Sequence, residues 1–334
     1  VVSVVWIIGI ASRILCRDLN REVDPFYVGW YLSLVAEAVL EVGLSLAWEI
    51  VAGKGKKKGP QVIVLGMGKL GGRELSYNSD LDVIFLYDGS AEGHEFFSKL
   101  GQKVISILSI PTGEGYAYKI DMGLRPSGRS GALVTSYDAF RKYQEESAQI
   151  WERQSLLRAR ASAGDIKLGK RVMKSIEEFV YLKPLPPDFH KEINYLRTRM
   201  ETELARESAK KLNIKTGKGG IVDIEFLVQM LQLRYGGEHP EVRGRNTGDA
   251  LTGLRDAGII KERQYSELMD GLCFLKKMEN LLRLLHDRSI NELYESDFDK
   301  LSSELETDSD GKHLRKRYVA VTNGIRKLYD KYFS

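Results

Sequence analysis

The pattern of apolar and polar positions divides the chain into three zones. In the first, residues 1–52, apolar residues recur at helical spacing, and Asp24-Pro25 marks the start of a second helix. The long apolar stretch over residues 32–51 is interrupted by three glutamates, which favours a buried amphipathic helix over a membrane span. We therefore predict a helical first zone and no membrane partner.

Short β-branched or aromatic runs bounded by Gly and Asp distinguish the second zone, residues 60–135. Such runs are typical of strands, and they predict strands over 62–65, 83–87, 116–120 and 132–135. From Ser136 onward a period of 3.6 residues dominates. It predicts helices over 136–161, 165–182, 187–212, 220–235, 247–257, 260–289 and 312–332. The expected fold is α+β: a small sheet with helices, followed by a helical bundle.

These zones define three predicted domains. Residues 1–58 form a helical lead-in and basic linker, residues 59–163 carry the sheet, and residues 164–334 form the bundle. The hydrophobic fraction of 43% and the charged fraction of 29% are ordinary for a globular protein. The net charge of +4 is weak evidence for a polyanion, and the dense basic run Lys54–Lys58 is a solvated linker between Gly and Pro. We expect no nucleic-acid partner.

The cysteines and histidines indicate where the protein is located and which metal sites are not expected. Cys16 and Cys273 are too few and too far apart for a disulfide scaffold, which indicates the cytoplasm. The histidines are scattered and match no zinc spacing. A chain that begins with Val1 instead of methionine indicates either a fragment of a longer protein or a processed one.

The stretch from Gly66 to Phe85 holds the most informative motif. Its first part, a Gly-x-Gly-x-x-Gly run ending at Gly71 after a predicted strand, matches the glycine fingerprint of dinucleotide-binding folds. However, only the seven residues 72–78 separate it from the next charged motif, too few for a crossover helix and its return loop. The carboxylates that follow favour a different interpretation.

Asp80-Leu81-Asp82 places two carboxylates on one face of an extended strand, because residues i and i+2 point the same way. At this spacing they repel each other unless a divalent cation lies between them. Magnesium held this way can bridge the oxygens of a nucleoside triphosphate during in-line displacement. The preceding glycine turn offers backbone N–H groups to the leaving phosphates, and Lys69 adds a positive charge. The alternative is that both aspartates merely begin a strand.

A third carboxylate is expected from a neighbouring strand. Asp121 fits, because it ends the predicted strand 116–120 and can complete a metal site or accept a proton. Arg125, in the loop that follows, is a candidate contact for phosphate or for the target. The alternative role for Arg125 is to cap backbone carbonyls of its own loop.

Together these residues resemble the glutamine synthetase adenylyltransferases, bifunctional enzymes that carry two polymerase-β-like nucleotidyltransferase domains in one chain. The resemblance covers nearly the whole chain and is carried by the segments 68–75, 79–82, 121–131, 151–160 and 219–226. It implies a polymerase-β-like nucleotidyltransferase domain, with a small mixed sheet, followed by an α-helical domain.

The resemblance implies attack by a tyrosine hydroxyl of glutamine synthetase on the α-phosphate of ATP, with Mg²⁺ or alternatively Mn²⁺ as the metal. The implied catalytic and metal-binding residues are Asp80, Asp82 and Asp121. The implied nucleotide-binding residues are Gly68, Lys69, Gly71, Gly72, Ser79 and Arg125. In the full-length enzymes, a PII-type signalling protein and glutamine set the balance between AMP transfer and AMP removal.

Single residues favour the C-terminal, adenylylating half of such enzymes. Leu81 within Ser-Asp-Leu-Asp and Val222 before Asp223 are similar to that half, whereas the deadenylylating half more often has Ser-Asp-Ile-Asp and Arg-Glu-Ile-Glu. Phosphorolytic removal of AMP is therefore the alternative. One position departs from the family's Asp-x-Arg-Leu-Arg-Pro, because Gly123 replaces the first arginine. A degenerate, nucleotide-binding regulatory domain is the third hypothesis.

Four further residues are candidates for contacts with the cleft or the target: Arg158, Arg160, Asp223 and Glu225. The arginines can face either solvent or the nucleotide phosphates. The two acidic residues lie about 200° apart around a helix, so one is expected to face the cleft and the other to form a local ion pair. The alternative for Asp223 is to cap the helix that begins after Gly219-Gly220.

Overall fold

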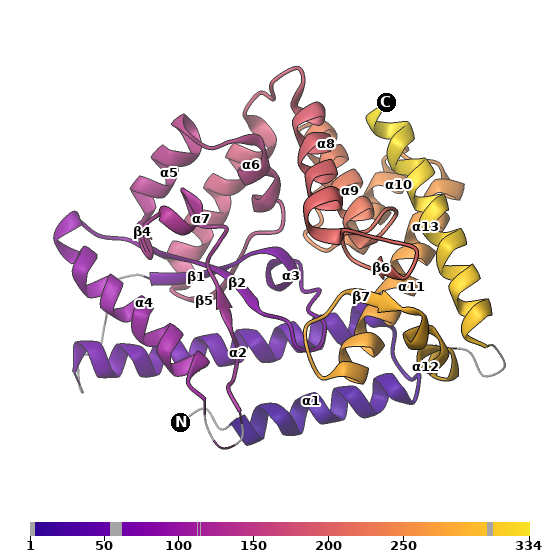
Figure 1. Cartoon of the computed structure of the whole chain (residues 1–334). Helices are drawn as coiled ribbons and strands as arrows, with labels where there is room; N and C mark the ends of the chain where they lie inside the picture. The colour runs from indigo at the N-terminus through magenta and orange to yellow at the C-terminus, as the bar shows by residue number, and fades with distance from the viewer. Residues whose placement is uncertain (1–3, 54–61, 112, 114, 306–309) are drawn as a thin grey trace. The chain divides into compact units, whose positions relative to one another are not determined.

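The computed structural model describes residues 4–53, 62–111, 113, 115–305 and 310–334, which form two compact units (Figure 1). The sheet unit contains the residues up to Arg17, Gly29–Leu75 and Ser79–Lys183. The helical unit contains Asp18–Val28, Ser76–Asn78 and Pro184–Ser334. The basic run predicted as a linker, residues 54–58, lies outside the described residues.

A small mixed sheet forms the centre of the sheet unit. Its strand order is β3-β2-β1-β5, with β4 also paired to β2. β1 is antiparallel to β2 and β5, whereas β2 is parallel to β3 and β4. The bounds are β1 Val62–Gly66, β2 Leu81–Tyr87, β3 Ile120–Asp121, β4 Val134–Ser136 and β5 Arg160–Gly164. The predicted combination of a mixed sheet with helices is thus confirmed.

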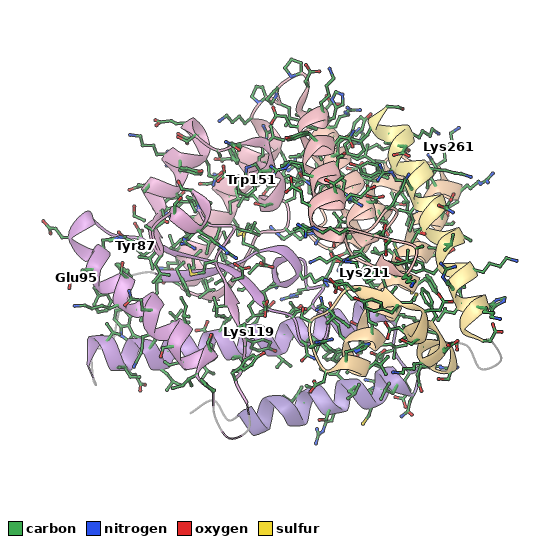
Figure 2. All side chains as sticks on the ribbon, in the orientation of Figure 1. Tyr87, Glu95, Lys119, Trp151, Lys211 and Lys261 are labelled. Carbon is green, nitrogen blue, oxygen red and sulfur yellow. The ribbon has the colours of Figure 1, made fainter. Side chains whose placement is uncertain are left out.

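The side chains of the two central strands, β1 and β2, explain why these segments form buried strands. β1 and β2 consist almost entirely of β-branched, leucine and aromatic residues, and nearly all of them are buried, as expected for strands covered on both faces. Both strands were predicted within two residues of their ends. Tyr87, the last residue of β2, stacks on Phe97 of α4 (His94–Ser109), with ring centroids 4.1 Å apart (Figure 2 labels Tyr87).

Two predicted elements are wrong in this unit. The strand expected over 116–120 is reduced to β3, because only Ile120 and Asp121 pair with β2. The single helix expected over 136–161 is instead α5 (Tyr137–Glu146), α6 (Ile150–Leu156) and strand β5. β5 has the sequence Arg-Ala-Ser-Ala-Gly, without a β-branched residue, so its pairing with β1 and not its own propensity makes it a strand.

Helices cover both faces of β5. The Cβ atom of Ala161 faces Gly169 of α7 (Ile166–Glu177), while the neighbouring side chain of Arg160 reaches Glu37 of α2 (Pro25–Ala52). Because successive strand residues point to opposite faces, α7 and α2 lie on opposite sides of the sheet, as Figure 1 shows. The predicted helix within residues 32–51 is confirmed as part of α2.

The helical unit is built around α9 (Ile221–Tyr235), which is buried along nearly its whole length. It contacts four other helices: α8 (Phe189–Arg199), α10 (Thr247–Asp256), α11 (Glu262–His286) and α13 (Gly311–Phe333). Three elements were not predicted, namely α12 (Glu295–Leu305) and the paired strands β6 (Lys211–Asn213) and β7 (Glu292–Tyr294). The expected helix over 187–212 ends in a π-helical turn, Met200–Ala205.

Among the described residues, no helix is both long enough and apolar enough to span a membrane. That includes α1 (Val4–Leu19) and the long apolar helix α2. Cys16 and Cys273 are both free thiols, which agrees with the absence of a disulfide scaffold expected from their number.

Candidate active site

The strands that carry the predicted carboxylates lie side by side in the sheet unit. β2 pairs in parallel with β3, with Leu81 opposite Ile120 and Asp82 opposite Asp121. The N–H of Leu81 donates to the carbonyl oxygen of Lys119 at 2.9 Å, and Lys119 is labelled in Figure 2. Because directly paired residues project from the same face of a sheet, Asp82 and Asp121 share one face.

Asp80 is the residue directly before β2, and Asp82 is the second residue of that strand. Asp80 and Asp121 are exposed, and Asp82 is half-buried at the second position of β2. Buried apolar residues follow Asp82 as far as Tyr87, so the carboxylates gather where the strand leaves the core. This end of β2 is therefore both acidic and accessible to a ligand.

The glycine turn lies directly against Asp82. The N–H of Met67 donates to the Asp82 carbonyl oxygen at 2.9 Å, and the short helix α3 (Gly68–Gly71) begins there. Gly68 has a φ of +49°, and a Cβ atom at this position would come within 2.7 Å of Asp82 Oδ2. A Cβ atom at Gly71 would lie 1.9 Å from the carbonyl oxygen of Arg158. Gly71 is thus required by close backbone approach, and Gly68 by its positive φ and the adjacent Asp82 carboxylate.

Two arginines, Arg158 and Arg160, lie next to the glycine turn. Arg158 is buried and pairs with buried Glu74 at 3.4 Å. Arg160 donates to the carbonyl oxygens of Leu70 and Gly71 at 2.8 and 3.0 Å. These carbonyls end α3, where a cation is also favoured by the helix dipole. The Arg160 guanidinium therefore holds the backbone of the glycine turn, while Arg158 pairs with the Glu74 side chain.

Two glutamates that the sequence interpretation missed complete this support. Glu74 is the buried partner of Arg158, and Glu37 of α2 pairs with both Arg73 and Arg160. Glu37 was noted only as an interruption of an apolar stretch. Glu37 is half-buried, and a charged residue with little access to water needs a partner, so a glutamate within an apolar stretch was the available signal.

The loop after β3 holds itself together through Arg125. Its Nη1, Nη2 and Nε atoms donate to the carbonyl oxygens of Met122, Arg129 and Gly131 at 2.8, 2.8 and 3.1 Å. This arrangement matches the carbonyl-capping role considered for Arg125. Gly123 donates its N–H to Asp121 Oδ1 at 2.7 Å, which turns that carboxylate toward its own loop.

The donor set suits a hard divalent cation, because Asp80, Asp82 and Asp121 offer only oxygen ligands. Within the described residues, however, no three His, Cys, Asp or Glu side chains surround a common point. Asp121 Oδ1 instead accepts the hydrogen bond from the Gly123 amide. Asp121 is exposed, so its side chain has room to change rotamer.

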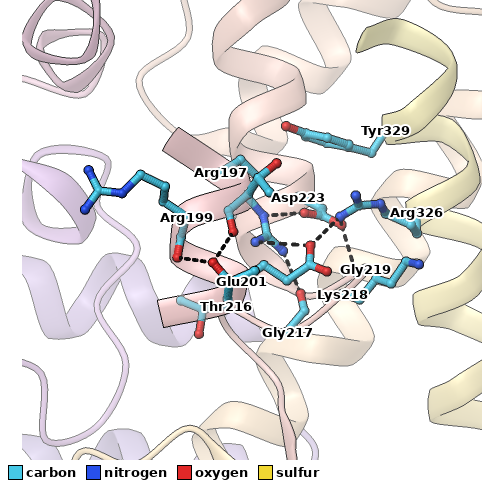
Figure 3. A network of polar contacts seen from close by, with 12 residues as sticks. Arg197, Arg199, Glu201, Thr216, Gly217, Lys218, Gly219, Asp223, Arg326 and Tyr329 are labelled. Atoms are coloured by element: carbon cyan, nitrogen blue, oxygen red, sulfur yellow. Dashed lines mark hydrogen bonds and ion pairs between the residues drawn. The ribbon is translucent and has the colours of Figure 1, made fainter. Parts of the chain in front are cut away.

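Asp223 lies in a buried polar network of the helical unit, shown in Figure 3. It is fully buried, forms an ion pair with Arg197, and lies 3.5 Å from Arg326. Its Oδ2 accepts a 2.7 Å hydrogen bond from the N–H of Gly219, directly before α9. Asp223 therefore holds the turn just before α9, whose N-cap Gly220 has no side-chain cap, and it forms the local ion pair with Arg197.

The network ties three helical segments together. Arg197 of α8 also donates to the carbonyl oxygen of Gly217 at 2.7 Å, and Arg326 of α13 pairs with Glu201 at 2.7 Å. Glu225, two residues after Asp223, is buried as well. The structure thus places both acidic residues of α9 in the interior of the helical unit.

Two protein families match successive parts of the chain. The glutamate-ammonia ligase adenylyltransferase family matches residues 10–175. The GlnD PII-uridylyltransferase family matches residues 189–333, which lie in the helical unit. The first match contains the glycine turn and all three aspartates.

Curated proteins named "bifunctional glutamine synthetase adenylyltransferase/adenylyl-removing enzyme" are similar over most of the chain. The protein from Hahella chejuensis is 34% identical over 298 residues, which cover 84% of this chain and 31% of that protein. The one from Xanthomonas campestris pv. campestris is 38% identical over 245 residues, covering 70% and 26% respectively. The one from Pseudomonas aeruginosa is 33% identical over 307 residues, covering 86% and 31%. The chain thus spans less than a third of the length of each of these relatives.

Proposed function

The chain belongs to the glutamate-ammonia ligase adenylyltransferase family, and on that premise we propose that it transfers AMP from ATP to a tyrosine hydroxyl of glutamine synthetase. In this reaction the tyrosine oxygen forms a bond to the α-phosphorus as the bond to pyrophosphate breaks. The observation that carries the proposal is the register of Asp82 with Asp121, beside the glycine turn. We assign the sheet unit to the polymerase-β-like nucleotidyltransferase fold.

Asp80 and Asp82 would hold a divalent cation, Mg²⁺ or Mn²⁺, through their carboxylate oxygens, with Asp121 as a third ligand. The bound ion would neutralise charge on the triphosphate oxygens. Gly68 leaves the space beside Asp82 free of a side chain, so the triphosphate can approach the carboxylate. Asp121 is exposed and is suited to accept the proton of the attacking hydroxyl.

The glycine turn is the proposed phosphate-binding segment, with Gly68, Lys69, Gly71, Gly72 and Ser79 lining it. Its backbone is held by Arg160, whose bonds to the Leu70 and Gly71 carbonyls prevent the turn from opening. A fixed backbone lowers the reorganisation needed when the phosphates bind. In this scheme Arg125 supports the loop next to Asp121.

The resemblance of Leu81 and Val222 to the adenylylating half supports AMP transfer as the direction of reaction. The match of the helical unit to PII-uridylyltransferases supports a PII-type protein as a partner of the full-length enzyme. Glutamine is proposed as effector from the family resemblance alone. The proposed location is the cytoplasm, where the target and ATP are both available.

Pyrophosphate release tests the proposal. Glutamine synthetase, ATP and Mg²⁺ should give pyrophosphate with the wild-type chain and not with Asp82→Asn. Asp88→Asn is the matched control, because Asp88 follows the other end of β2 and pairs with Arg171. This variant should retain activity.

The direction of transfer is tested separately, with adenylylated glutamine synthetase and phosphate in place of ATP. Release of ADP in this mixture alone would assign the chain to AMP removal. Absence of both reactions, from folded protein that binds ATP, would leave a regulatory domain.

A further inference from the structure

A pocket lies between helices α5 and α7 of the sheet unit (Figure 1). Its volume is about 580 Å³, within the range of about 300–1,000 Å³ that is usual for small-molecule sites. One wall is a face of α5, and the other is formed by α7 and the π-helical turn Glu178–Leu182 that follows it. All of the lining residues belong to the sheet unit, so the pocket is a feature of one compact body.

Helical spacing builds the two walls. Tyr137, Phe140 and Gln144 line the pocket from α5 at intervals of three and four residues, so they share one face of that helix. Arg171 and Ser175 line it from α7 in the same way. The walls meet at one end of the pocket, where the Tyr137 hydroxyl lies 2.6 Å from Ser175 Oγ. The Arg171 guanidinium lies there too, 4.8 Å from the centroid of the Tyr137 ring.

A lysine and the π-helical turn close the other end. Lys183 Nζ donates to the carbonyl oxygen of Glu145 at 2.6 Å, which joins the end of the turn to α5. The buried Arg153 donates through Nε and Nη2 to the carbonyl oxygen of Val180 at 3.1 and 2.9 Å. Turns of the π-helical kind are frequent at functional sites. This one is held in place by a buried guanidinium.

The buried lining residues include a polar group without a partner. Phe140 and Ile176 are 1% and 4% exposed and make this part of the pocket apolar. Gln144 is 5% exposed, and its Oε1 has no hydrogen-bond partner in the part of the chain that the structure describes. A buried amide oxygen without a partner costs free energy. Rotation about the last torsion exchanges the amide oxygen and nitrogen, so Gln144 can offer a ligand either an acceptor or a donor.

Cationic side chains outnumber carboxylates around the pocket. Four cations and two carboxylates line it: Arg141, Arg171, Lys174 and Lys183, with Glu145 and Glu178. The pairs Arg141–Glu145 and Lys174–Glu178 are exposed and loose, at 3.6 and 3.9 Å. Exposed pairs of this kind contribute little, so another anion can replace the carboxylate. Lys183 donates to a neutral carbonyl oxygen, which leaves its charge available to a ligand.

The pocket is separate from the carboxylates of the candidate active site. Arg171 pairs with Asp88, the residue directly after β2, whereas Asp82 lies at the beginning of that strand. At about 3.3 Å per residue, the extended chain places these two ends of β2 about 20 Å apart. A ligand in the pocket is therefore too far from Asp82 to take part in AMP transfer.

We propose that this pocket binds a small organic anion with a flat aromatic body. The rings of Tyr137, Phe140 and Phe179 supply apolar contact area, and the lining cations attract the anionic group. Gln144 adds one polar contact within the apolar part, as is usual in small-molecule sites. The site needs no metal ion and is independent of the proposed AMP transfer.

Anilinonaphthalene sulfonate (ANS) is a suitable probe, because it is an aromatic anion whose fluorescence rises when it leaves water. The wild-type chain should bind it at one site. Gln144→Leu removes the amide at a similar side-chain volume and should weaken binding about tenfold. Its thermal midpoint should stay equal or rise, because the oxygen without a partner is gone. A lower midpoint together with unchanged binding would show that the amide is structural and would overturn its assignment to the site.

A matched pair of double variants tests the charge. Arg141→Gln combined with Lys174→Gln removes two lining cations and should weaken ANS binding about tenfold, because each exposed charge contributes a few-fold. Lys142→Gln combined with Lys170→Gln removes two exposed cations from the same two helices, outside the pocket lining. This control should bind ANS as the wild-type chain does. Equal weakening in both double variants would reduce the effect to net charge and would overturn the proposal.

Competition for bound ANS identifies the source of the anion. AMP is compared with its neutral counterpart adenosine, and indoleacetate with its neutral counterpart indoleacetamide. In at least one pair the anion should displace ANS at a concentration about tenfold lower than the neutral compound. Displacement by neither anion, or equal displacement by anion and neutral compound in both pairs, would overturn the proposal.

The same probe separates this inference from the proposed function. ANS bound in the pocket should remain in the presence of saturating ATP and Mg²⁺ and in Asp82→Asn. Displacement by ATP and Mg²⁺, or loss of binding in Asp82→Asn, would assign the probe to the candidate active site and overturn the inference. Binding that depends on Gln144, in a chain that transfers no AMP, would support the pocket while the proposed function fails.

Discussion

Gly68 and Asp82 approach each other so closely that a Cβ atom on Gly68 would lie 2.7 Å from Asp82 Oδ2. The contact joins the glycine turn to the carboxylate strand, and the Met67 N–H bond to the Asp82 carbonyl holds them together. The same proximity places a turn rich in backbone N–H groups beside a carboxylate. A phosphate bridged to that carboxylate by a cation would meet both, which is the arrangement that nucleotidyl transfer requires.

Gly68→Ala should abolish AMP transfer because its methyl group displaces the Asp82 carboxylate. Gly258→Ala is the control, since Gly258 has a φ of +71° with no atom within 4 Å of its Cβ position. Each alanine should cost about 1–2 kcal/mol in unfolding free energy for its left-handed backbone. Activity should be lost only in Gly68→Ala, measured as pyrophosphate release, and equal activity in the two variants would argue against the role of this contact.

Arg158→Met should destabilise the sheet unit, because it leaves the buried carboxylate of Glu74 without its ion-pair partner. The expected loss is about 3 kcal/mol in the free energy of unfolding. Arg141→Met breaks an exposed pair with Glu145 and should change stability by less than about 0.5 kcal/mol. Urea unfolding measures both values. A similar small change in both variants would show that the buried pair contributes little.

Gly123→Arg should raise the rate of AMP transfer about tenfold, if the added guanidinium forms one charged hydrogen bond with the phosphates. A Cβ atom at this position would lie 3.1 Å from Asp121 Oδ1, a tight contact that the exposed Asp121 side chain must relieve by a small shift. Gly123→Ala controls for the Cβ atom itself. A rate equal to that of Gly123→Ala would show that the missing arginine is not what limits the reaction.

Asp18→Asn should stabilise the protein at neutral pH. Burial raises the pKa of Asp18, although the hydrogen bond from Tyr77 and the charge of Lys277 oppose this shift. A raised folded-state pKa favours the protonated form, so its stabilising contribution is full below the unfolded pKa of 3.8 and is lost as the pH rises through the folded value. The advantage of asparagine should therefore shrink as the pH falls toward 4. Chemical unfolding at several pH values measures it, and an advantage that grows on acidification would contradict the assignment.

The central strands could be predicted from the sequence because their own residues determine them. β1 and β2 are β-branched and apolar runs that end at Gly66 and just before Asp88. β5 could not be recognised, since the small residues of Arg160–Gly164 form a strand only through pairing with β1. The break between α5 and α6 could not be recognised either, because the helical spacing of apolar residues continues from one helix into the next.

The candidate site shows the same division. The D-x-D spacing and the position of Asp121 after an apolar run are local signals, whereas the register of Asp82 with Asp121 appears only in the pairing of β2 with β3. The partners of Arg158 and Arg160 could not be inferred, because Glu74 and Glu37 approach them only in the folded chain. The pocket between α5 and α7 is likewise invisible in the sequence, because its walls come from two helices whose separation is set by the folded chain.

Intact-mass spectrometry of glutamine synthetase tests the central claim most directly. The target is incubated with this chain, ATP and Mg²⁺, beside a parallel sample that contains Asp82→Asn. We expect the target to gain the mass of one adenylyl group per modified subunit with the wild-type chain and to remain unchanged with Asp82→Asn. An unchanged target mass with folded wild-type protein, or an equal gain with Asp82→Asn, would contradict the account.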